Sequence, residues 1–158
     1  MEGIVSDSTT IITLTNISRV DVLSNLFDKI YIPEKVYEEI VQKENVMLDD
    51  TFFIKKVIED KGLCHLLGKS LDSGESEAIV LAKEMGLRLL IDEKKGRKIA
   101  FSMDVKIIGL IGLLMLNVKH NKLSSNEVLN VYRSVKSDGF RVGHNLEDNF
   151  IDYVKSFR

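Results

Sequence analysis

Short apolar runs alternate with longer amphipathic stretches along most of the chain, and this alternation constrains the fold more than any other feature. The apolar runs have the length of buried strands. They cover residues 3–6, 29–32, 88–91 and 105–110. Strands that alternate with helices are typical of a parallel sheet covered on both faces. We therefore expect an α/β fold with three layers (α/β/α) and a mostly parallel central sheet.

The helices predicted between and after these strands follow from apolar spacing and from capping residues. They cover residues 20–27, 33–42, 51–61, 72–85, 93–103, 111–121, 124–139 and 146–157. Segment 9–15 (TTIITLT) is rich in β-branched residues, and its propensity favours a strand, although tertiary contacts can override such a preference.

The size and composition of the chain indicate its domain organisation. Its 158 residues suit one hydrophobic core, and no repeat, low-complexity tract or flexible linker interrupts them. We expect a single domain over residues 1–158, with a core at 3–140 and a C-terminal helix at 146–157. The formal net charge of −2 gives no overall attraction to nucleic acid, so such binding would need a local basic patch.

The compartment is predicted from features that the sequence lacks. A lone cysteine, Cys64, cannot form an internal disulfide, which fits a reducing environment. The N-terminus has no basic segment followed by an apolar one, as a secretory signal would. The longest apolar stretch, 107–116, has about ten residues, whereas a membrane span needs roughly twenty. We expect a cytoplasmic protein without a membrane-spanning segment.

Acidic residues occupy positions where a parallel sheet would bring them together. Asp7 and Asp92 directly follow apolar runs, and the carboxyl ends of parallel strands share one edge of a sheet. Glu75 opens a predicted helix, Glu39 lies within another, and Glu93 follows Asp92. Carboxylate oxygens without His or Cys suit hard cations such as Mg²⁺ or Mn²⁺. Such clusters support hydrolysis of phosphodiester bonds.

Each carboxylate also has a structural explanation, and these explanations stay open. Asp7 can cap the turn that follows it, and Glu75 lies where a helix dipole favours a negative charge. Helical phase does not separate Glu38 from Glu39. Asp92 and Glu93 can begin a helix without binding anything.

Three segments carry a more specific combination of motifs. They are SDSTTIITLTNISRVDVLSNLFDKIYIPEKVYEEI (6–40), LDSGESEAIVLAKEMGLRLLIDEKKGRKIA (71–100) and VKIIGLIGLLMLNVKHNKL (105–123). In this order they resemble PIN-like domain proteins, in particular a prokaryotic subfamily of uncharacterised function related to VapC-type toxin ribonucleases. The resemblance implies a PIN-like fold, with a parallel sheet between helices.

The resemblance also implies roles for individual residues. Asp7, Glu39, Glu75 and Asp92 match the acidic positions that hold the metal ion, with Glu93 assisting at the last of them. Thr9 matches a small hydroxyl residue that often supports the site. The chain departs from the family pattern at two positions, with Glu75 in place of the usual aspartate and Ile91 in place of a Thr or Ser.

A basic run follows the last acidic pair directly. It consists of Lys94, Lys95, Arg97 and Lys98. Next to a metal site these residues, together with Thr9, would contact the phosphates of a nucleic acid. A solvated helix face explains the same charges equally well.

These observations favour a metal-dependent endoribonuclease that uses Mg²⁺ or Mn²⁺, with RNA as substrate and the role of a toxin in a toxin–antitoxin pair. The resemblance implies an antitoxin protein and a second copy of the chain as partners. An apolar stripe on the last helix either covers the core or forms such an interface: Phe150, Ile151, Val154 and Phe157.

Two other hypotheses stay open. A non-catalytic PIN-like module would bind RNA or a protein. A flap-type DNA nuclease ranks last, because the chain lacks an added helical arch or duplex-binding element.

Overall fold

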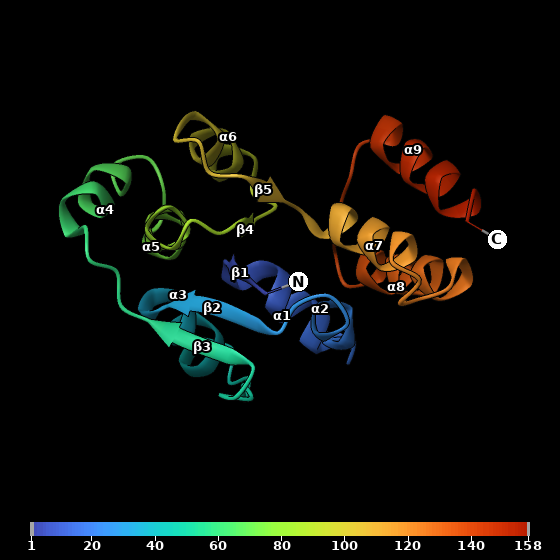
Figure 1. Ribbon diagram of the computed structural model, residues 1–158, viewed down its shortest axis with the longest axis horizontal. Coiled ribbons are helices and arrows are strands. Elements are labelled where there is room, and N and C mark those ends of the chain that lie inside the picture. Colours follow the sequence, from blue (N-terminus) through green and yellow to red (C-terminus); the bar gives the residue numbers. More distant parts are fainter. Residues whose placement is uncertain (1, 158) are drawn as a thin grey trace.

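A five-stranded sheet in which every strand is parallel to its neighbours forms the centre of the protein, in a computed structural model that describes residues 2–157 (Figure 1). Its strand order is β3-β2-β1-β4-β5. The strands are β1 (Gly3–Ser6), β2 (Lys29–Pro33), β3 (Phe53–Lys56), β4 (Leu89–Leu90) and β5 (Ile107–Ile108). The predicted α/β class with a parallel central sheet is therefore confirmed.

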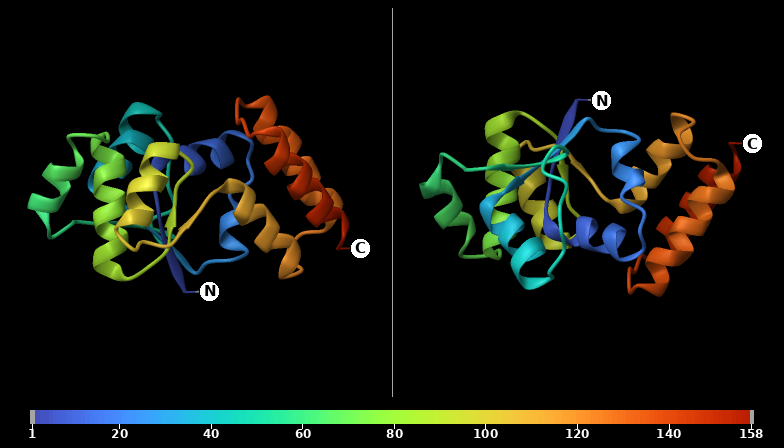
Figure 2. Two further views of the ribbon diagram at one scale, coloured as in Figure 1. Left: turned by 90° about the horizontal axis from the view of Figure 1, so that it is seen from above. Right: turned by 90° about the horizontal axis from the view of Figure 1, so that it is seen from below.

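The helices lie on both sides of this sheet. They are α1 (Ser8–Asn16), α2 (Asp21–Ser24), α3 (Glu34–Glu38), the π-helix η1 (Glu39–Lys43), α4 (Lys61–Leu67), α5 (Ser73–Met85), α6 (Lys94–Ser102), α7 (Leu110–Lys119), α8 (Ser125–Ser137) and α9 (His144–Lys155). Figures 1 and 2 show α4 and α5 at one end of the long axis, α7, α8 and α9 at the other, and the strands between them. This arrangement gives the three layers expected for an α/β/α fold.

The central strands are mostly apolar because both faces of the sheet are covered, whereas the edge strand β3 ends in two exposed lysines. Ile4 and Val5 in β1, Ile30 in β2, and Leu89 and Leu90 in β4 are completely buried. Such residues drive formation of the sheet, since each buried aliphatic side chain contributes about 1.5–3 kcal/mol relative to exposure. The core continues into α5 and α7.

The capping signals in the sequence set the ends of two helices. The side chain of Asp72 accepts a hydrogen bond from the backbone N–H of Glu75 and begins α5, which ends at Gly86 with a left-handed φ of 64°. Glycine adopts this conformation at little cost. Ser124 and Glu127 form a capping box at the start of α8.

Two predicted elements are wrong. Segment 9–15 is not a strand but part of α1, because a helix brings Thr10, Ile11 and Leu14 to one buried face. Segment 51–61 is not a helix. It contains the edge strand β3, whose Phe53 pairs with Ile30 of β2, and it ends where α4 begins. Pairing with a distant strand decides this conformation.

The apolar stripe of the last helix faces inward. Phe150 and Val154 of α9 are buried, and Ile151 and Phe157 pack against the core. The alternative that the stripe covers the core is the one that the structure supports. None of the helices described between residues 2 and 157 is long and apolar enough to cross a membrane.

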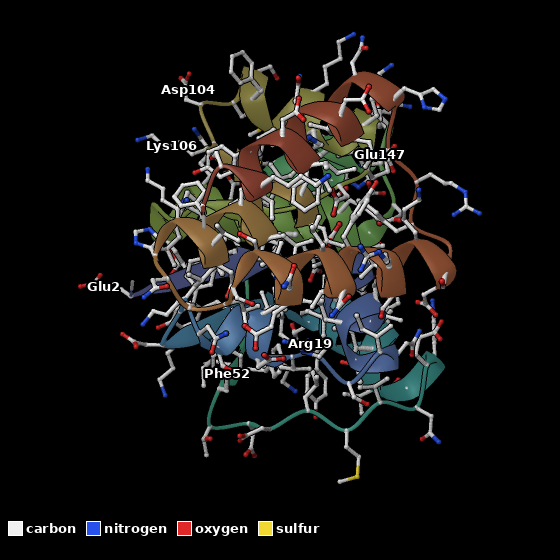
Figure 3. All side chains as sticks on the ribbon, turned by 90° about the vertical axis from the view of Figure 1, so that its right-hand side faces the viewer. Glu2, Arg19, Phe52, Asp104, Lys106 and Glu147 are labelled. Atoms are coloured by element: carbon white, nitrogen blue, oxygen red, sulfur yellow. The ribbon has the colours of Figure 1, made fainter. Side chains whose placement is uncertain are left out.

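The parallel strands give the molecule two distinct edges. Glu2 precedes β1 and Lys106 precedes β5, and Figure 3 shows both on one side of the molecule, with Glu147 of α9 on the other. The amino ends of the strands therefore lie on the side of Glu2. Their carboxyl ends, where ligands of parallel α/β sheets bind, lie on the side of Glu147.

Candidate active site

Asp7 and Asp92 emerge side by side from neighbouring strands. Ser6 of β1 is in register with Leu90 of β4, and the backbone N–H of Asp7 donates to the carbonyl oxygen of Leu90 at 3.1 Å. Asp7 follows β1 directly, and Asp92 follows β4 after Ile91. The parallel sheet thus brings together two carboxylates that lie far apart in the sequence.

A small pocket of about 100 Å³ opens beside Asp7 at this edge of the sheet. Five of the residues around it are acidic: Asp7, Glu39, Asp72, Glu75 and Glu93. Ser8, Thr9 and Gly74 complete the lining. We call this space the acidic pocket. Four of the five predicted acidic residues line it, and Asp92 lies just outside.

Glu39 reaches the acidic pocket from the turn where α3 changes into the π-helix η1. Its neighbour Glu38 instead forms an ion pair with Lys35 at 3.5 Å, so the structure separates the two glutamates that helical phase could not. A Cβ atom at Gly74 would lie 3.4 Å from Oε2 of Glu39 and 3.6 Å from Oδ1 of Asp72. The glycine leaves room for both carboxylates.

Glu93 and Glu75 meet beside Gly96 of α6. Glu93 caps this helix and accepts hydrogen bonds from the backbone N–H groups of Lys95 (3.1 Å) and Gly96 (2.6 Å). A Cβ atom at Gly96 would lie 3.1 Å from Oε2 of Glu75 and 3.4 Å from Oε2 of Glu93. The absence of a side chain at Gly96 therefore allows these two carboxyl groups to approach.

Asp92 is held by groups from two helices. The hydroxyl of Thr10 in α1 donates to its Oδ2 at 3.2 Å, and the backbone N–H of Leu110 donates to Oδ1 at 3.2 Å and Oδ2 at 3.1 Å. The guanidinium of Arg97 lies 4.0 Å from Oδ1 and donates to the carbonyl oxygen of Ile91. These contacts fix the orientation of Asp92 and partly compensate its charge.

Burial and mutual repulsion make the acidic pocket unfavourable for fully ionised carboxylates. Burial raises the pKa of Asp7 to about 8, and the charges of Asp92, Glu39 and Asp72 act in the same direction. Burial also raises the pKa of Glu75 to about 8, together with the nearby carboxyl groups of Asp72 and Glu93. Both groups retain a proton near neutral pH unless a cation replaces it.

The other two shifts show how the protein distributes this charge. Burial raises the pKa of Asp92, although the N–H of Leu110, the hydroxyl of Thr10 and Arg97 oppose the shift. The N–H of Gly96 lowers the pKa of Glu93, so in the pair with Glu75 the proton resides on Glu75. The pocket therefore combines ionised and protonated carboxyl groups at one edge of the sheet.

Two oxygen atoms in this pocket have no hydrogen-bond partner among residues 2–157. Oδ1 of Asp7 and Oε2 of Glu75 are buried, and neither accepts a hydrogen bond within the described chain. A buried acceptor without a partner costs about 1–3 kcal/mol. A hard divalent cation prefers this kind of ligand, so the residues fit Mg²⁺ or Mn²⁺.

The carboxylates surround the pocket without closing on a common point. Over residues 2–157, no three His, Cys, Asp or Glu side chains come together as a group that could hold a metal ion. Ion binding would therefore require these side chains to move toward one another.

Asp72 and Thr10 are functional candidates that the sequence did not single out as such. Asp72 caps α5 and also lines the acidic pocket. The hydroxyl that contacts a site carboxylate belongs to buried Thr10, whereas the predicted Thr9 lies exposed at the pocket. The cap position of Asp72, three residues before Glu75, was the available signal.

The structure divides the predicted basic run. Lys94 and Arg97 line a larger groove that also includes Asp92. Lys95 and Lys98 are exposed on α6 and line neither this groove nor the acidic pocket. The positive charge next to the site therefore comes from Lys94 and Arg97.

Comparisons with known proteins place this geometry in a family. The family model DUF3368, described as a PIN domain, matches residues 3–156. Neither the curated proteins nor the solved structures yielded a match. The family model spans all five strands and the acidic pocket between them. The chain therefore belongs to the PIN-domain family DUF3368.

Proposed function

We propose that this protein is a metal-dependent endoribonuclease that hydrolyses phosphodiester bonds of RNA with Mg²⁺ or Mn²⁺. PIN domains are often metal-dependent nucleases, so family membership supports a nuclease-type role. Family membership does not specify the substrate or the metal ion, so RNA and Mg²⁺ or Mn²⁺ are our proposal.

One observation carries the proposal: the buried, unpartnered oxygen atoms of Asp7 and Glu75 within a pocket of five acidic residues. Burying several carboxylates together lowers the stability of the folded protein. Oδ1 of Asp7 and Oε2 of Glu75 make no hydrogen bond that would offset this cost. A cation would partner both atoms and permit the carboxyl groups to ionise.

Asp7, Glu39 and Glu75 would hold the ion from inside the acidic pocket, and Asp92 from its rim. A bound divalent ion supplies an activated water and neutralises charge on the scissile phosphate. Thr10 and the N–H of Leu110 keep the Asp92 carboxylate in place. Glu93, whose pKa is lowered mainly by the N–H of Gly96, stays ionised at neutral pH and is available to accept a proton from water.

Attack of water in line with the leaving oxygen would break the P–O3′ bond. The products would be a 5′-phosphate and a 3′-hydroxyl. The water proton would pass to a carboxylate of the pocket, and the leaving O3′ would take a proton from solvent. The cations Lys94 and Arg97 lie where they would contact phosphates next to the cleaved bond.

The biological role is a further part of the proposal. A toxin of a toxin–antitoxin pair, with an antitoxin as partner and a homodimer as its working form, follows from the resemblance of the sequence. The apolar stripe of α9 does not support a dimer interface, because Phe150 and Val154 are buried in the core.

A second candidate function is a non-catalytic module that binds RNA or a protein partner. The observation that favours it is that no three potential ligands converge over residues 2–157. In such a module, Asp7 and Glu75 would remain protonated, and divalent ions would affect neither binding nor stability.

The decisive experiment is cleavage of a mixed RNA pool by the purified protein with Mn²⁺, compared with EDTA and with Asp7→Asn. The matched control is Asp50→Asn, an exposed acid that precedes β3 at the opposite edge of the sheet. We expect cleavage by the wild type and Asp50→Asn, and none by Asp7→Asn or in EDTA. Cleavage retained by Asp7→Asn would refute the site assignment. RNA binding without cleavage, unchanged by chelator, would favour the binding module.

A further inference from the structure

A groove of about 690 Å³ opens next to the acidic pocket, and neither the metal-binding carboxylates nor the core accounts for it. Its walls come from the start of α6, the end of β5, the first turns of α7 and the connection between α8 and α9. Figure 1 shows this connection passing beside the start of α7 to reach α9. We call this space the side groove.

The side groove and the acidic pocket adjoin at two consecutive residues. Asp92 lines the side groove, and Glu93 lines the acidic pocket. Asp7 follows β1 and Asp92 follows the neighbouring strand β4, with the N–H of Asp7 bonded to the carbonyl oxygen of Leu90, so the two residues lie side by side. A chain molecule whose reacting bond lies at Asp7 would therefore extend directly into the side groove.

The two spaces carry opposite charges. The acidic pocket is lined by carboxylates, whereas three cations line the side groove: Lys94, Arg97 and Arg141. Two backbone carbonyl groups, of Lys136 and Phe140, accept hydrogen bonds from the Arg141 guanidinium at 3.1 and 3.0 Å and hold it at the groove. Cations in this arrangement bind a phosphate group.

The start of α9 adds to this preference for an anion. Its N-cap is Gly143, which lines the side groove and has no side chain to cap the helix. Glu147 in the first turn is already engaged, since its carboxylate accepts hydrogen bonds from Lys136 (2.8 Å) and Tyr132 (2.5 Å). The uncapped N–H groups of the first turn favour an anionic group such as a phosphate.

The rest of the side groove is apolar. Ile107, Ile111, Met115, Phe140 and Leu146 line it, and Leu146 remains 49% exposed. An apolar wall with one aromatic ring beside cations suits a nucleobase attached to a phosphate, because every base has an apolar face that stacks without regard to sequence.

We propose that the side groove binds one nucleotide of a single-stranded RNA, next to the phosphodiester that lies at Asp7. Lys94 and Arg141 contact its phosphate, and Phe140 and Leu146 contact its base. The position of the reacting bond at Asp7 rests on the proposed nuclease function. The binding of a nucleotide in the side groove does not. In this proposal Lys94 and Arg97 lie in the groove that binds the nucleotide, whereas Lys98 of the same basic run lies outside it.

The test measures binding of a short, fluorescently labelled single-stranded RNA of mixed sequence by anisotropy, in EDTA, at several salt concentrations. Each lost phosphate contact should lower the slope of log affinity against log salt by about 0.7. We expect this loss for Lys94→Gln and for Arg141→Gln. The matched control is Lys98→Gln, which removes an exposed cation of the same helix α6 that does not line the groove.

Two apolar variants separate base contacts from phosphate contacts. Phe140→Leu and Leu146→Ser should weaken binding by about tenfold without changing the salt slope, since loss of stacking or apolar contact costs about 1.4 kcal/mol. Circular dichroism and thermal unfolding of each variant establish that it is folded. A loss of affinity with an unchanged slope is the result expected from a base site.

The outcomes also separate this inference from the proposed function. If Lys94→Gln and Arg141→Gln lose slope while Lys98→Gln does not, the groove binds RNA even where the wild type fails to cleave. If all three variants behave alike, the groove is not a phosphate site. That result would overturn the inference.

Discussion

The hydroxyl of Thr10 donates a hydrogen bond to Oδ2 of Asp92 at 3.2 Å, across 82 residues of sequence. Thr10 lies in the first turns of α1, directly after Asp7, and Asp92 follows β4. The bond therefore links the segment that leaves β1 to the segment that leaves β4. Through this bond, helix α1, which begins directly after Asp7, holds the side chain of Asp92 in position.

Replacing Thr10 by valine tests this link. The variant keeps the shape of the side chain but removes the donor, so Asp92 loses one of the groups that hold it. We expect the free energy of unfolding to fall by about 1 kcal/mol and cleavage to slow by about tenfold. Urea denaturation and the initial cleavage rate are the two measurements.

The control for this variant is Thr13→Val, since Thr13 is a half-buried threonine of the same helix α1. It experiences the same change in helix propensity without a contact to Asp92. Equal effects of the two substitutions on cleavage would show that the hydroxyl of Thr10 has no positioning role.

The difference between predicted and observed site residues has a physical origin. Asp7 and Asp92 could be identified because apolar runs end directly before them, and strand ends of a parallel sheet meet at one edge. Thr10 and Asp72 were not predicted as part of the site, and only the cap position of Asp72 gave a signal in the sequence. Their contribution depends on contacts with residues that are distant in sequence or on a pocket formed only after folding.

The two wrong secondary-structure predictions have the same cause. The β-branched residues of segment 9–15 favour a strand, but burial of Ile11 and Leu14 on one helical face outweighs this propensity. Segment 51–61 has apolar residues at spacings that also suit a helix. Its Phe53 and Ile54 form β3 because Ile30 and Tyr31 of β2 offer a partner strand. Hydrogen bonding to a distant strand leaves little trace in local sequence.

The pH dependence of stability provides a test of the acidic pocket. In the metal-free protein the pKa of Asp7 is raised to about 8, whereas an aspartate in an unfolded chain titrates near 3.9. The folded state therefore binds more protons than the unfolded state between these values. The free energy of unfolding should fall as the pH rises from about 5 to about 8.

Asp7→Asn removes this group and should flatten the decline. In EDTA at about pH 8 we expect the variant to be more stable than the wild type. The variant buries a neutral amide, whereas the wild type either buries a charged carboxylate or must take up a proton to neutralise it. Asp50→Asn, at the exposed loop before β3, should follow the wild-type curve. Parallel curves for wild type and Asp7→Asn would show that Asp7 titrates normally in the folded protein.

Metal binding should reverse the effect of pH on the wild type. The ion competes with the protons of Asp7 and Glu75, whose pKa values are both raised to about 8, so its affinity increases with pH. We expect Mn²⁺ to raise the melting temperature more at about pH 8 than at about pH 6. Differential scanning fluorimetry measures this shift. The same increase in Asp7→Asn would place the bound ion elsewhere on the protein.

Gly109 offers a way to displace Asp92 without changing any acidic residue. A Cβ atom at Gly109 would lie 2.5 Å from Oδ1 of Asp92 and 2.5 Å from Nη1 of Arg97. Both atoms belong to side chains, and the extended backbone of Gly109 (φ −106°) suits alanine. Gly109→Ala should therefore move Asp92 and Arg97 while the fold persists.

We expect Gly109→Ala to lower the cleavage rate by about tenfold or more while reducing the free energy of unfolding by only about 1 kcal/mol. Gly62→Ala is the control, because Gly62 is an exposed glycine of α4 that lines neither the acidic pocket nor the side groove. A Cβ atom there would lie no closer than 3.7 Å to its nearest neighbour, Oδ1 of Asp60. Cleavage that is equally fast in both variants would mean that the position of Asp92 does not limit the reaction. A loss confined to Gly109→Ala would tie the rate to Asp92 and Arg97, because these are the two side chains that the added methyl group meets.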